Sequence, residues 1–344
     1  MSIKNHQGPS LGISEEIHAM KYRSKGESFR EAMSRVADSL KDSEDHYNQF
    51  REILLDQRFL PAGRVQSAMG SPRRVTPYNC FVSMTIEDSM EGIMKAATEA
   101  AKTMQLGGGI GYDFSTLRPH GALIKSLDSR SSGPLSFMGI FDALCKTISS
   151  AGHRRGAQMA VLRVDHPDIL EYIKAKNNST NLTQFNMSVG VTDDFMEAVK
   201  KDTDFDLVFE GRVYSTIRAK ALWDDILRST WDWAEPGILF IDRINRKNNL
   251  HYCEYIAATN PCGEQPLPPN GACLLGSFNL TQYVEKNIDS GFSFNLEKLK
   301  HDIPNVVRAM DNVVDRATYP LPAQQLEAQS KRRMGLGITG VANA

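Results

Sequence analysis

Hydrophobic residues recur at helical spacing in several long segments of the chain. Between residues 27 and 57 the apolar side chains follow one another mostly at intervals of three or four, which predicts helical structure over this range. Residues 90–105 form a second such segment, and Asp88 and Ser89 before it are good N-cap residues. Helices are also predicted over 136–150, 166–176, 193–201 and 219–234, and a periodic apolar run spans Leu296 to Thr318.

Short apolar runs between these segments predict strands. Strands and helices alternate over the middle of the chain, which favours an α/β fold with parallel strands and crossover helices. Residues 59–74 and 151–158 are predicted to be irregular, and residues 106–114 to break the helix before them. The predicted strands cover 78–86, 159–164, 184–192 and 237–245, with a hairpin over 204–209 and 211–216.

The sequence ends in a motif that predicts more structure than the chain contains. Residues 335–340 are expected to form a strand or turn that enters a helix, yet the chain stops at Ala344, where that helix would begin. We therefore expect a fragment or one half of a split protein.

Composition and charge exclude several classes of function. The 344 residues are 41% hydrophobic and 24% charged, which is ordinary for a globular protein of two domains or one large α/β domain. A net charge of -1 gives no basic surface for a nucleic-acid polymer. The N-terminus lacks the apolar core of a signal peptide, and no run is long enough to span a membrane. The expected compartment is the cytoplasm, or a host cytoplasm if the gene is viral.

Five cysteines are scattered along the chain without a CxxC pair or zinc-finger spacing, so no metal site is predicted. Cys145, in an apolar run, is predicted to be a small buried hydrophobe, and the same is expected of Cys253.

Cys262 stands in a more unusual setting, because Asn260 precedes it and Glu264 follows it at two residues' distance. A thiolate here can act as a nucleophile, a metal ligand, a redox partner or a radical carrier. Pro261, Pro266 and the intervening glycine predict a rigid loop that projects the thiol. Glu264 can exchange protons and Asn260 can orient a substrate hydroxyl. A tight proline turn around a buried cysteine remains an alternative explanation.

These residues belong to a set of motifs that resembles the catalytic subunit of ribonucleotide reductase. The resemblance extends from about Phe59 to Ala344. The sequences NPCGEQPLPP and GGGIGYDFSTLRP are most similar to the class II, adenosylcobalamin-dependent branch. The matching stretches are FLPAGRVQ, YNCFV, EDSMEGI, GGGIGYDFSTLRP, SAGHRRGAQMAVLRVDHPDI, FNMSVGVTDDFM, EPGILFIDRIN, ATNPCGEQPLPP, GACLLGSFNL and RRMGLGITG.

The resemblance implies a role for each residue around the thiols. Cys262 matches the cysteine that becomes a thiyl radical and abstracts the 3′-hydrogen of the substrate ribose. Glu264 matches the carboxylate that takes the 3′-hydroxyl proton, and Asn260 the amide that bonds the ribose hydroxyls. Cys80 and Cys273 match the pair that supplies reducing equivalents and ends as a disulfide. A sulfur radical also needs a place shielded from water.

Three further positions match the family's substrate pocket. Gly109 aligns with a glycine that contacts the substrate, although its GGGIG stretch by itself is equally well explained as a packing turn. Asn79 occupies a position that often holds serine in the family. Arg64 falls in a segment that lines the pocket.

The resemblance also implies a second ligand, a deoxynucleoside triphosphate effector. One set of effector contacts matches the start of a helix, whose free amides suit phosphate. The other contacts match arginines that bind the triphosphate or transmit the effector signal. Without the resemblance, an exposed charged loop would explain the arginines. The matched residues are Asp88, Ser89, Met90, Arg118, Arg154 and Arg155.

The implied fold is a ten-stranded α/β barrel of the ribonucleotide reductase and glycyl-radical type. This chain would hold an N-terminal helical region (1–58) without an evident ATP cone, then an incomplete barrel (59–344). The incomplete barrel comprises the first half-barrel and a central finger loop near residues 258–273. The implied partners are a ribonucleoside di- or triphosphate, a thioredoxin- or glutaredoxin-type reductant, the complementary C-terminal half and a second copy of this chain in a homodimer. The alternatives are a class I subunit, which takes its radical from a metal-containing partner, and an inactive effector-binding half. A glycyl-radical reductase is disfavoured, because no matching C-terminal glycine loop is seen.

Overall fold

The computed structural model describes residues 8–124, 128–148, 156–177, 180–287 and 291–344, and these residues form two compact units. Within the described residues, one unit contains the segments up to Asn79 and from Ala272 onward. The other contains the chain from Cys80 to Gly271.

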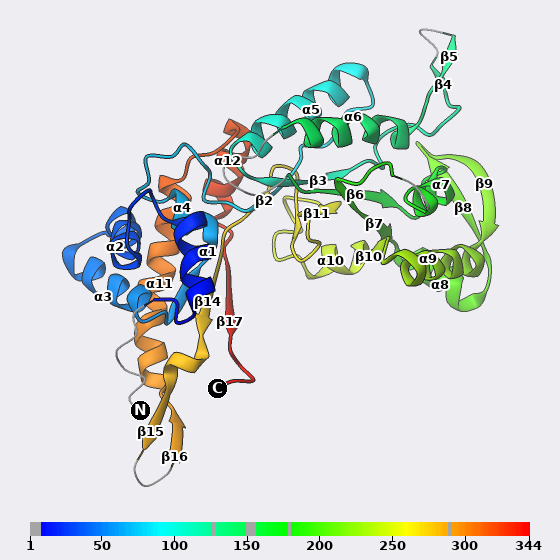
Figure 1. The fold of residues 1–344 in the computed structure, drawn as a ribbon. Helices are drawn as coiled ribbons and strands as arrows, with labels where there is room; N and C mark the ends of the chain where they lie inside the picture. The colour runs from blue at the N-terminus through cyan, green and yellow to red at the C-terminus, as the bar shows by residue number, and fades with distance from the viewer. Residues whose placement is uncertain (1–7, 125–127, 149–155, 178–179, 288–290) are drawn as a thin grey trace. The chain divides into compact units, whose positions relative to one another are not determined.

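The unit from Cys80 to Gly271 is built on a parallel sheet. Five of its strands lie in the order β10-β7-β6-β3-β2, and every neighbouring pair among them is parallel. Figure 1 shows α5 and α6 along one face of this sheet and β11 of the finger loop against the other. The strands are β2 (Cys80–Val82), β3 (Gly109–Asp113), β6 (Gln158–Arg163), β7 (Phe185–Val191) and β10 (Gly237–Phe240).

Crossover helices connect these strands, as the alternating pattern predicts. The sequence-based bounds of α5 (Met90–Gln105) are confirmed, and the Ser89 hydroxyl caps it by accepting a bond from the Gly92 amide. The other elements here are α6 (Pro134–Thr147), α7 (Ile169–Lys174), α8 (Asp193–Lys201), α9 (Ala219–Trp233), α10 (Ile241–Lys247), and the pairs β4–β5 (Leu123–Ile124, Ser129–Arg130), β8–β9 (Asp204–Phe209, Arg212–Arg218) and β11–β12 (Ala258–Thr259, Pro266–Leu267).

An aromatic cluster fills the space between the sheet and its helices. Tyr112 of β3 packs edge-on against Phe141 of α6, with ring centroids 4.9 Å apart, and against Phe185 of β7. The Tyr112 hydroxyl donates to Gln158 Oε1, whose amide nitrogen donates to the Phe141 carbonyl. These side chains are fully buried, so the polar atoms among them are paired as burial requires.

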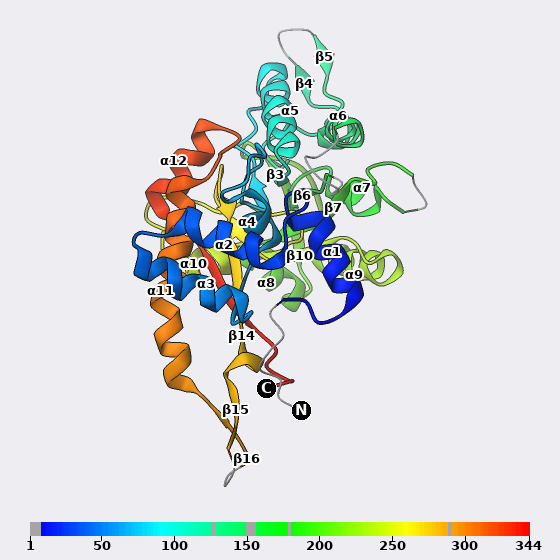
Figure 2. The same ribbon diagram turned by 60° about the vertical axis from the view of Figure 1, so that its left-hand side comes forward.

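The second unit packs helices around the long helix α11. Both views of the ribbon show α11 running beside α2 and α3 (Figures 1 and 2). β14 pairs with β1 in antiparallel and with β17 in parallel orientation. The elements are α1 (Gly12–Tyr22), α2 (Phe29–Leu40), α3 (Glu44–Leu55), β1 (Phe59–Pro61), α4 (Gly63–Ala68), β13 (Ala272–Cys273), β14 (Leu275–Asn279), a 3₁₀ turn (Leu280–Tyr283), β15 (Val284–Asn287), β16 (Gly291–Phe294), α11 (Leu296–Arg316), α12 (Pro322–Lys331) and β17 (Gly335–Thr339).

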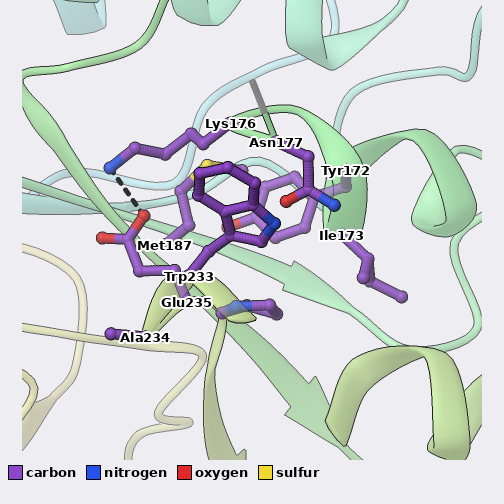
Figure 3. A pocket seen from close by; sticks show the side chains of 9 residues that line it. Tyr172, Ile173, Lys176, Asn177, Met187, Trp233, Ala234 and Glu235 are labelled. Atoms are coloured by element: carbon purple, nitrogen blue, oxygen red, sulfur yellow. Dashed lines mark ion pairs between the residues drawn. The ribbon is translucent and has the colours of Figure 1, made fainter. Parts of the chain in front are cut away.

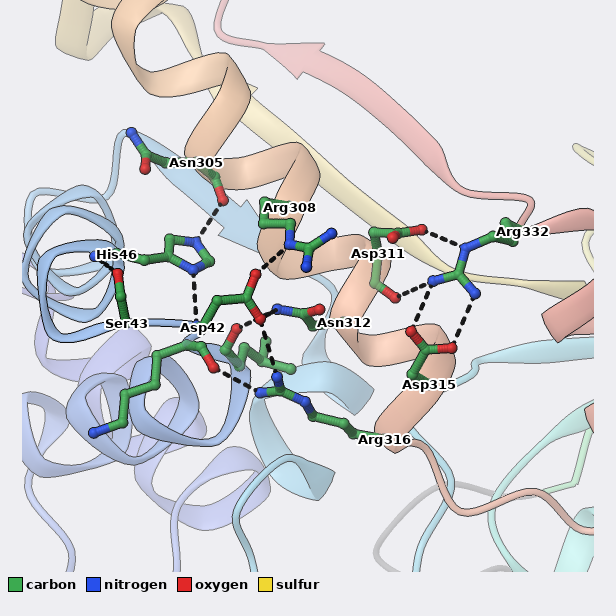
Figure 4. Close-up of polar contacts among 12 residues, drawn as sticks. Asp42, Ser43, His46, Asn305, Arg308, Asp311, Asn312, Asp315, Arg316 and Arg332 are labelled. Atoms are coloured by element: carbon green, nitrogen blue, oxygen red, sulfur yellow. Dashed lines mark hydrogen bonds and ion pairs between the residues drawn. The ribbon is translucent and has the colours of Figure 1, made fainter.

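The helical prediction over residues 27–57 requires a correction, because a break at residues 41–43 separates α2 from α3. Ser43 caps α3 by accepting from the His46 amide, while Asp42 turns outward to α11. There its carboxylate meets Arg308, Asn312 and Arg316 (Figure 4). Two short helices joined by this acidic corner can both contact α11, which one continuous helix would not allow.

Two other sequence-based assignments were wrong, and one strand was not predicted. Residues 106–114 do end the helix before them, since α5 stops at Gln105, but Gly109–Asp113 also form strand β3 in the middle of the sheet. The strand predicted over 237–245 ends at Phe240, where α10 begins. Residues 59–74, expected to be irregular, contain β1 and α4. Within the described residues, no helix is both long and apolar enough to span a bilayer.

Candidate active site on the finger loop

The finger loop lies against β3 because two glycines leave room for its backbone. A Cβ placed on Gly111 would lie 1.8 Å from the Thr259 carbonyl oxygen, and one on Gly109 would lie 2.8 Å from Cγ of Pro261. No side chain can be accommodated at such distances. Gly109 and Gly111 alternate with Ile110 and Tyr112, which point to the buried helix side. The glycine-rich stretch therefore forms a flat strand that the loop crosses.

A side chain from β7 also anchors the loop. The Asn186 amide nitrogen donates to the Pro261 carbonyl at 2.7 Å. Met159 of β6 pairs in register with both Gly111 and Asn186, so all three share the loop face of the sheet. The methyl group of Met159 would lie 3.6 Å from a Cβ on Gly263. The sheet thus contacts the loop on both sides of Cys262.

The loop is folded back on itself around Asn260. β11 and β12 pair in antiparallel orientation, and the Gln265 amide donates to Oδ1 of Asn260 at 3.0 Å. The Gly263 amide donates to the Asn260 carbonyl, with Gly263 in the left-handed region at φ +80°. Gly263 is required there, because this backbone conformation is strained for other residues.

The side-chain nitrogen of Asn260 has no hydrogen-bond partner among the described residues, although the side chain is fully buried. Leaving a buried amide donor unpaired costs about 1–3 kcal/mol, and such groups in native proteins usually have a purpose. Since Oδ1 is held by Gln265, the amide group has a fixed orientation. Asn260 therefore holds a buried hydrogen-bond donor in a fixed orientation.

The reactive groups predicted at the tip of the loop are exposed. Cys262 and Glu264 both lie on the surface, whereas Asn260 and Pro261 between the strands are buried. The shielding expected for a sulfur radical is thus not provided by the described part of this chain.

Cys80 lies on the same face of the sheet as the loop. It pairs in register with Gly109, which contacts Pro261, and side chains at paired positions of parallel strands point to the same face. The loop returns beside β2, where the Val82 amide donates to the Gly271 carbonyl at 2.8 Å. Val82 is two residues after Cys80, and Gly271 is two residues before Cys273. Cys80 and Cys273 are both buried, and they belong to different units.

The remaining cysteines are only partly as predicted. Cys145 is buried in α6, as expected. Cys253 was expected to be buried and is exposed, in the turn-rich segment that leads from α10 to the finger loop. It offers a second surface thiol, which precedes the finger loop in the sequence.

The chain resembles known proteins over most of its length. The family model described as "Ribonucleotide reductase, barrel domain" matches residues 78–344. This chain belongs to the ribonucleotide reductase family. A vitamin B12-dependent ribonucleoside-diphosphate reductase of Thermoplasma acidophilum is 38% identical over 88% of this chain and 39% of its own length.

Other curated reductases resemble the chain to a similar degree. The vitamin B12-dependent ribonucleoside-diphosphate reductase of Mycobacterium tuberculosis is 37% identical over 92% of this chain and 46% of its own length. The vitamin B12-dependent ribonucleotide reductase of Streptomyces clavuligerus is 30% identical over 93% of this chain and 35% of its own length. The chain therefore spans between about a third and a half of the length of these reductases.

Within the reductase fold, the predicted effector residues meet at the start of α5. The Arg118 guanidinium pairs with the Asp88 carboxylate at 2.6 Å and also donates to the Asp88 carbonyl. Ser89 is engaged as the N-cap, and Met90 is 57% exposed at the first turn. Arg118 is thus already paired with an acidic group. Arg154 and Arg155 lie outside the described residues.

The other predicted substrate residues belong to the unit that ends at Asn79. Arg64 lies in the short helix α4. Oδ1 of Asn79 is buried and has no hydrogen-bond partner among the described residues. Neither residue is in the unit that holds Cys262.

Sequence reasoning missed several residues that hold the loop in place. Gly111, Met159 and Asn186 were not singled out. The spacing of Gly109 and Gly111 contained a usable signal, because two glycines at alternate positions of a strand clear one face for a close neighbour. Nothing in the sequence marks Asn186, whose partner is 75 residues away.

Proposed function

We propose that this chain, together with a complementary C-terminal half, reduces ribonucleotides to 2′-deoxyribonucleotides by thiyl-radical chemistry for DNA precursor synthesis. The observation that supports it best is the finger loop. Its neck is held against Gly109 and Gly111, its buried Asn260 amide has a free donor, and its thiol is at the tip. Family membership and B12-dependent relatives give the reaction class.

Each residue has a defined part in the proposed reaction. A Cys262 thiyl radical takes the 3′-hydrogen of the ribose, and Glu264 accepts the 3′-hydroxyl proton. Asn260 donates a hydrogen bond to a ribose hydroxyl. The 2′-hydroxyl leaves as water, and the two electrons come from the thiols of Cys80 and Cys273, which become a disulfide. Cys262 recovers its hydrogen at the end, so one thiol pair is consumed per product and a thioredoxin- or glutaredoxin-type reductant restores it.

Substrate positioning is proposed to rest on glycine and amide groups near the loop. Gly109 is the proposed glycine contact of the substrate, and it lies so close to Pro261 that a side chain there would collide with the loop. Asn79 and Arg64 are the other two residues of the proposed set.

Adenosylcobalamin is the proposed radical source. The surface position of the Cys262 thiol fits this cofactor, since a thiol that must react with a bulky group has to be accessible. When bound, the cofactor supplies the one-electron oxidising equivalent that turns the thiol into a thiyl. This chain's own part is to hold the thiol at a fixed place, through the contacts of Thr259 and Pro261 with the sheet.

A ten-stranded barrel is the proposed context of the sheet. β10 is the edge strand, and its Ile238, Leu239 and Phe240 are only partly covered, with Phe240 43% exposed. An apolar edge with unpaired backbone groups favours pairing with another strand. A second set of five strands from the complementary half would cover it, and would also supply the water exclusion that Cys262 lacks here.

Effector control is proposed at the start of α5. A deoxynucleoside triphosphate would contact Asp88, Ser89 and Met90, and Arg118 would meet its phosphates by exchanging part of its pairing with Asp88. Arg154 and Arg155 complete the proposed effector contacts, and a homodimer is the proposed assembly.

The proposal is tested by reconstitution. The chain is coexpressed with the downstream reading frame and assayed with CDP and CTP, adenosylcobalamin, dithiothreitol and a deoxynucleotide effector. We expect deoxynucleotide from the wild type and from Cys253→Ala, whose thiol is exposed but lies outside the finger loop, and none from Cys262→Ala. Product that requires a metal-loaded partner subunit instead of the cobalamin would place the chain in class I. Product from Cys262→Ala would overturn the mechanism. If no product forms under either condition while the effector still binds, the chain is an inactive effector-binding half.

A further inference from the structure

A cavity of about 330 Å³ lies on the helix side of the parallel sheet, away from the finger loop. It is bounded by the end of α7, the start of β7 and the turn between α9 and β10. Figure 3 shows the Trp233 indole above the Met187 side chain, with Lys176 and Glu235 at one end of the cavity and Asn177 at the other. This volume is at the lower end of the range for small-molecule sites, roughly 300–1,000 Å³.

The walls of this cavity, which we call the α7–α9 pocket, are held by hydrogen bonds between the elements. The Ser229 hydroxyl contacts the carbonyls of Ile173 and Glu235 and the side chain of Asn177. The Thr230 hydroxyl donates to the Pro236 carbonyl at 2.7 Å, and the Tyr172 hydroxyl donates to the Ala160 carbonyl. The pocket is therefore already shaped before any ligand binds, which reduces the ordering cost of binding.

The charges in the pocket neutralise each other. Nζ of Lys176 is 2.6 Å from a Glu235 carboxylate oxygen and also donates to the Phe185 carbonyl at 2.7 Å. A charged ligand would have to disrupt this pair or remain unpaired while losing its hydration, and both are costly. The pocket thus favours a ligand without net charge.

The shape of the lining favours a flat ring. Trp233 is 46% exposed and presents an aromatic face, while Met187 and Ile173 are buried and apolar. Stacked aromatic rings gain about 0.5–1.5 kcal/mol beyond the area they bury, and thioethers also pack well on rings. Asn177 adds an amide that can donate and accept at the edge of a ring.

We propose that the α7–α9 pocket binds a neutral, flat heteroaromatic molecule of purine size, stacked on Trp233 and bonded at its edge by Asn177. The site is separate from the loop face, because Met187 and Asn186 alternate along β7. Met187 lines the pocket, whereas Asn186 holds the Pro261 carbonyl on the opposite face. An occupied pocket therefore stiffens the strand that anchors the finger loop.

Binding is measured by quenching of Trp233 fluorescence in the full chain. The three tryptophans include Trp231, which is 89% exposed and outside this pocket, so a Trp231→Phe background reduces the signal that does not report on the site. Adenine and benzimidazole are the neutral probes. We expect both probes to quench the fluorescence saturably. In variants that lack Trp233, binding is measured by thermal shift: Trp233→Leu is expected to weaken probe binding about tenfold, whereas Trp233→Phe is expected to retain it.

Two comparisons make the assignment specific. Asn177→Ala is expected to weaken adenine about fivefold, the effect of one lost hydrogen bond. Adenine at saturation is expected to slow alkylation of Cys262 without slowing that of Cys253. Absence of saturable binding up to millimolar probe, equal affinity in the Trp233→Leu variant, or displacement of adenine by a deoxynucleoside triphosphate would each overturn the proposal. These readouts need no reductase activity, so they stand or fall independently of the proposed reaction.

Discussion

Replacing Gly111 by alanine tests whether the finger loop depends on β3. The added Cβ would lie 1.8 Å from the Thr259 carbonyl oxygen, while real Cβ atoms keep at least about 3.0 Å from such atoms. The loop or the strand must therefore move by about 1.2 Å. Gly111 is central in the sheet, with β2 and β6 on either side, so most of the movement falls on the loop.

The expected cost follows from this displacement. Overpacking usually destabilises by about 1–3 kcal/mol, and a backbone contact this short lies at or above the upper end. A loss of about 3 kcal/mol corresponds to a fall of roughly 6–12 °C in the apparent Tm for a domain of this size. Displacing a reactive group by about 1 Å costs on the order of 100-fold in rate, so deoxynucleotide formation by the reconstituted protein falls at least that far.

Gly190→Ala is the matched control for this experiment. Gly190 lies in β7 of the same sheet, but a Cβ there would meet its nearest atom at 3.6 Å, which is ordinary contact. We expect its Tm within a few degrees of wild type, measured by the same thermal melt followed by circular dichroism. The site geometry would be wrong if Gly111→Ala had the same Tm as Gly190→Ala and left the alkylation rate of Cys262 unchanged. In that case the loop does not rest on β3.

Three further predictions concern thiols and ion pairs. Iodoacetamide is expected to label Cys253 and Cys262 before the buried cysteines, as measured by peptide mass mapping. Cys145 in α6 is expected to react most slowly, because burial and a nearby carboxylate raise the pKa of its thiol to about 11. Arg58→Ala should cost about 3–5 kcal/mol in urea unfolding, because it leaves the fully buried Asp302 carboxylate without its cation, whereas removing a surface arginine of α11 should cost under about 1 kcal/mol. Arg332 bridges two carboxylates of α11 and lowers the pKa of Asp315 (Figure 4). The stabilisation from this ion pair is therefore present above about pH 4 and lost as the pH falls through the lowered pKa. A variant without Arg332 should lose less stability on acidification.

The sequence was most informative where one segment determines its own structure. The helix over 90–105 was predicted to the residue because a serine cap and a stripe of small apolar side chains define both its start and its buried face. The strand containing GGGIG was missed for the opposite reason. Glycine has no side chain to create a pattern, and the contact that explains Gly111 comes from Thr259, far away in sequence.

The candidate site shows the same division. Cys262, Glu264 and Asn260 could be singled out from their spacing, and the structure places them on one loop. Burial of Cys253 was predicted from the general habit of free cysteine, which has no information about a surface turn. Asn186 could not be found, since a side-chain bond to a remote backbone carbonyl leaves no local trace. The assignments to substrate and effector remain predictions.

The two ends of the finger loop impose different requirements on the rest of the protein. Its neck is determined by this chain, because Thr259 and Pro261 lie against glycines and Asn186 holds the backbone between them. Its tip is not, because Cys262 and Glu264 are exposed, whereas the sulfur radical that we propose requires a dry surrounding. We propose that another surface provides this cover; the relatives are at least about twice as long as this chain. Substitutions in this chain alone can therefore test how the thiol is held, whereas only reconstitution with a complementary chain can test what the thiol does.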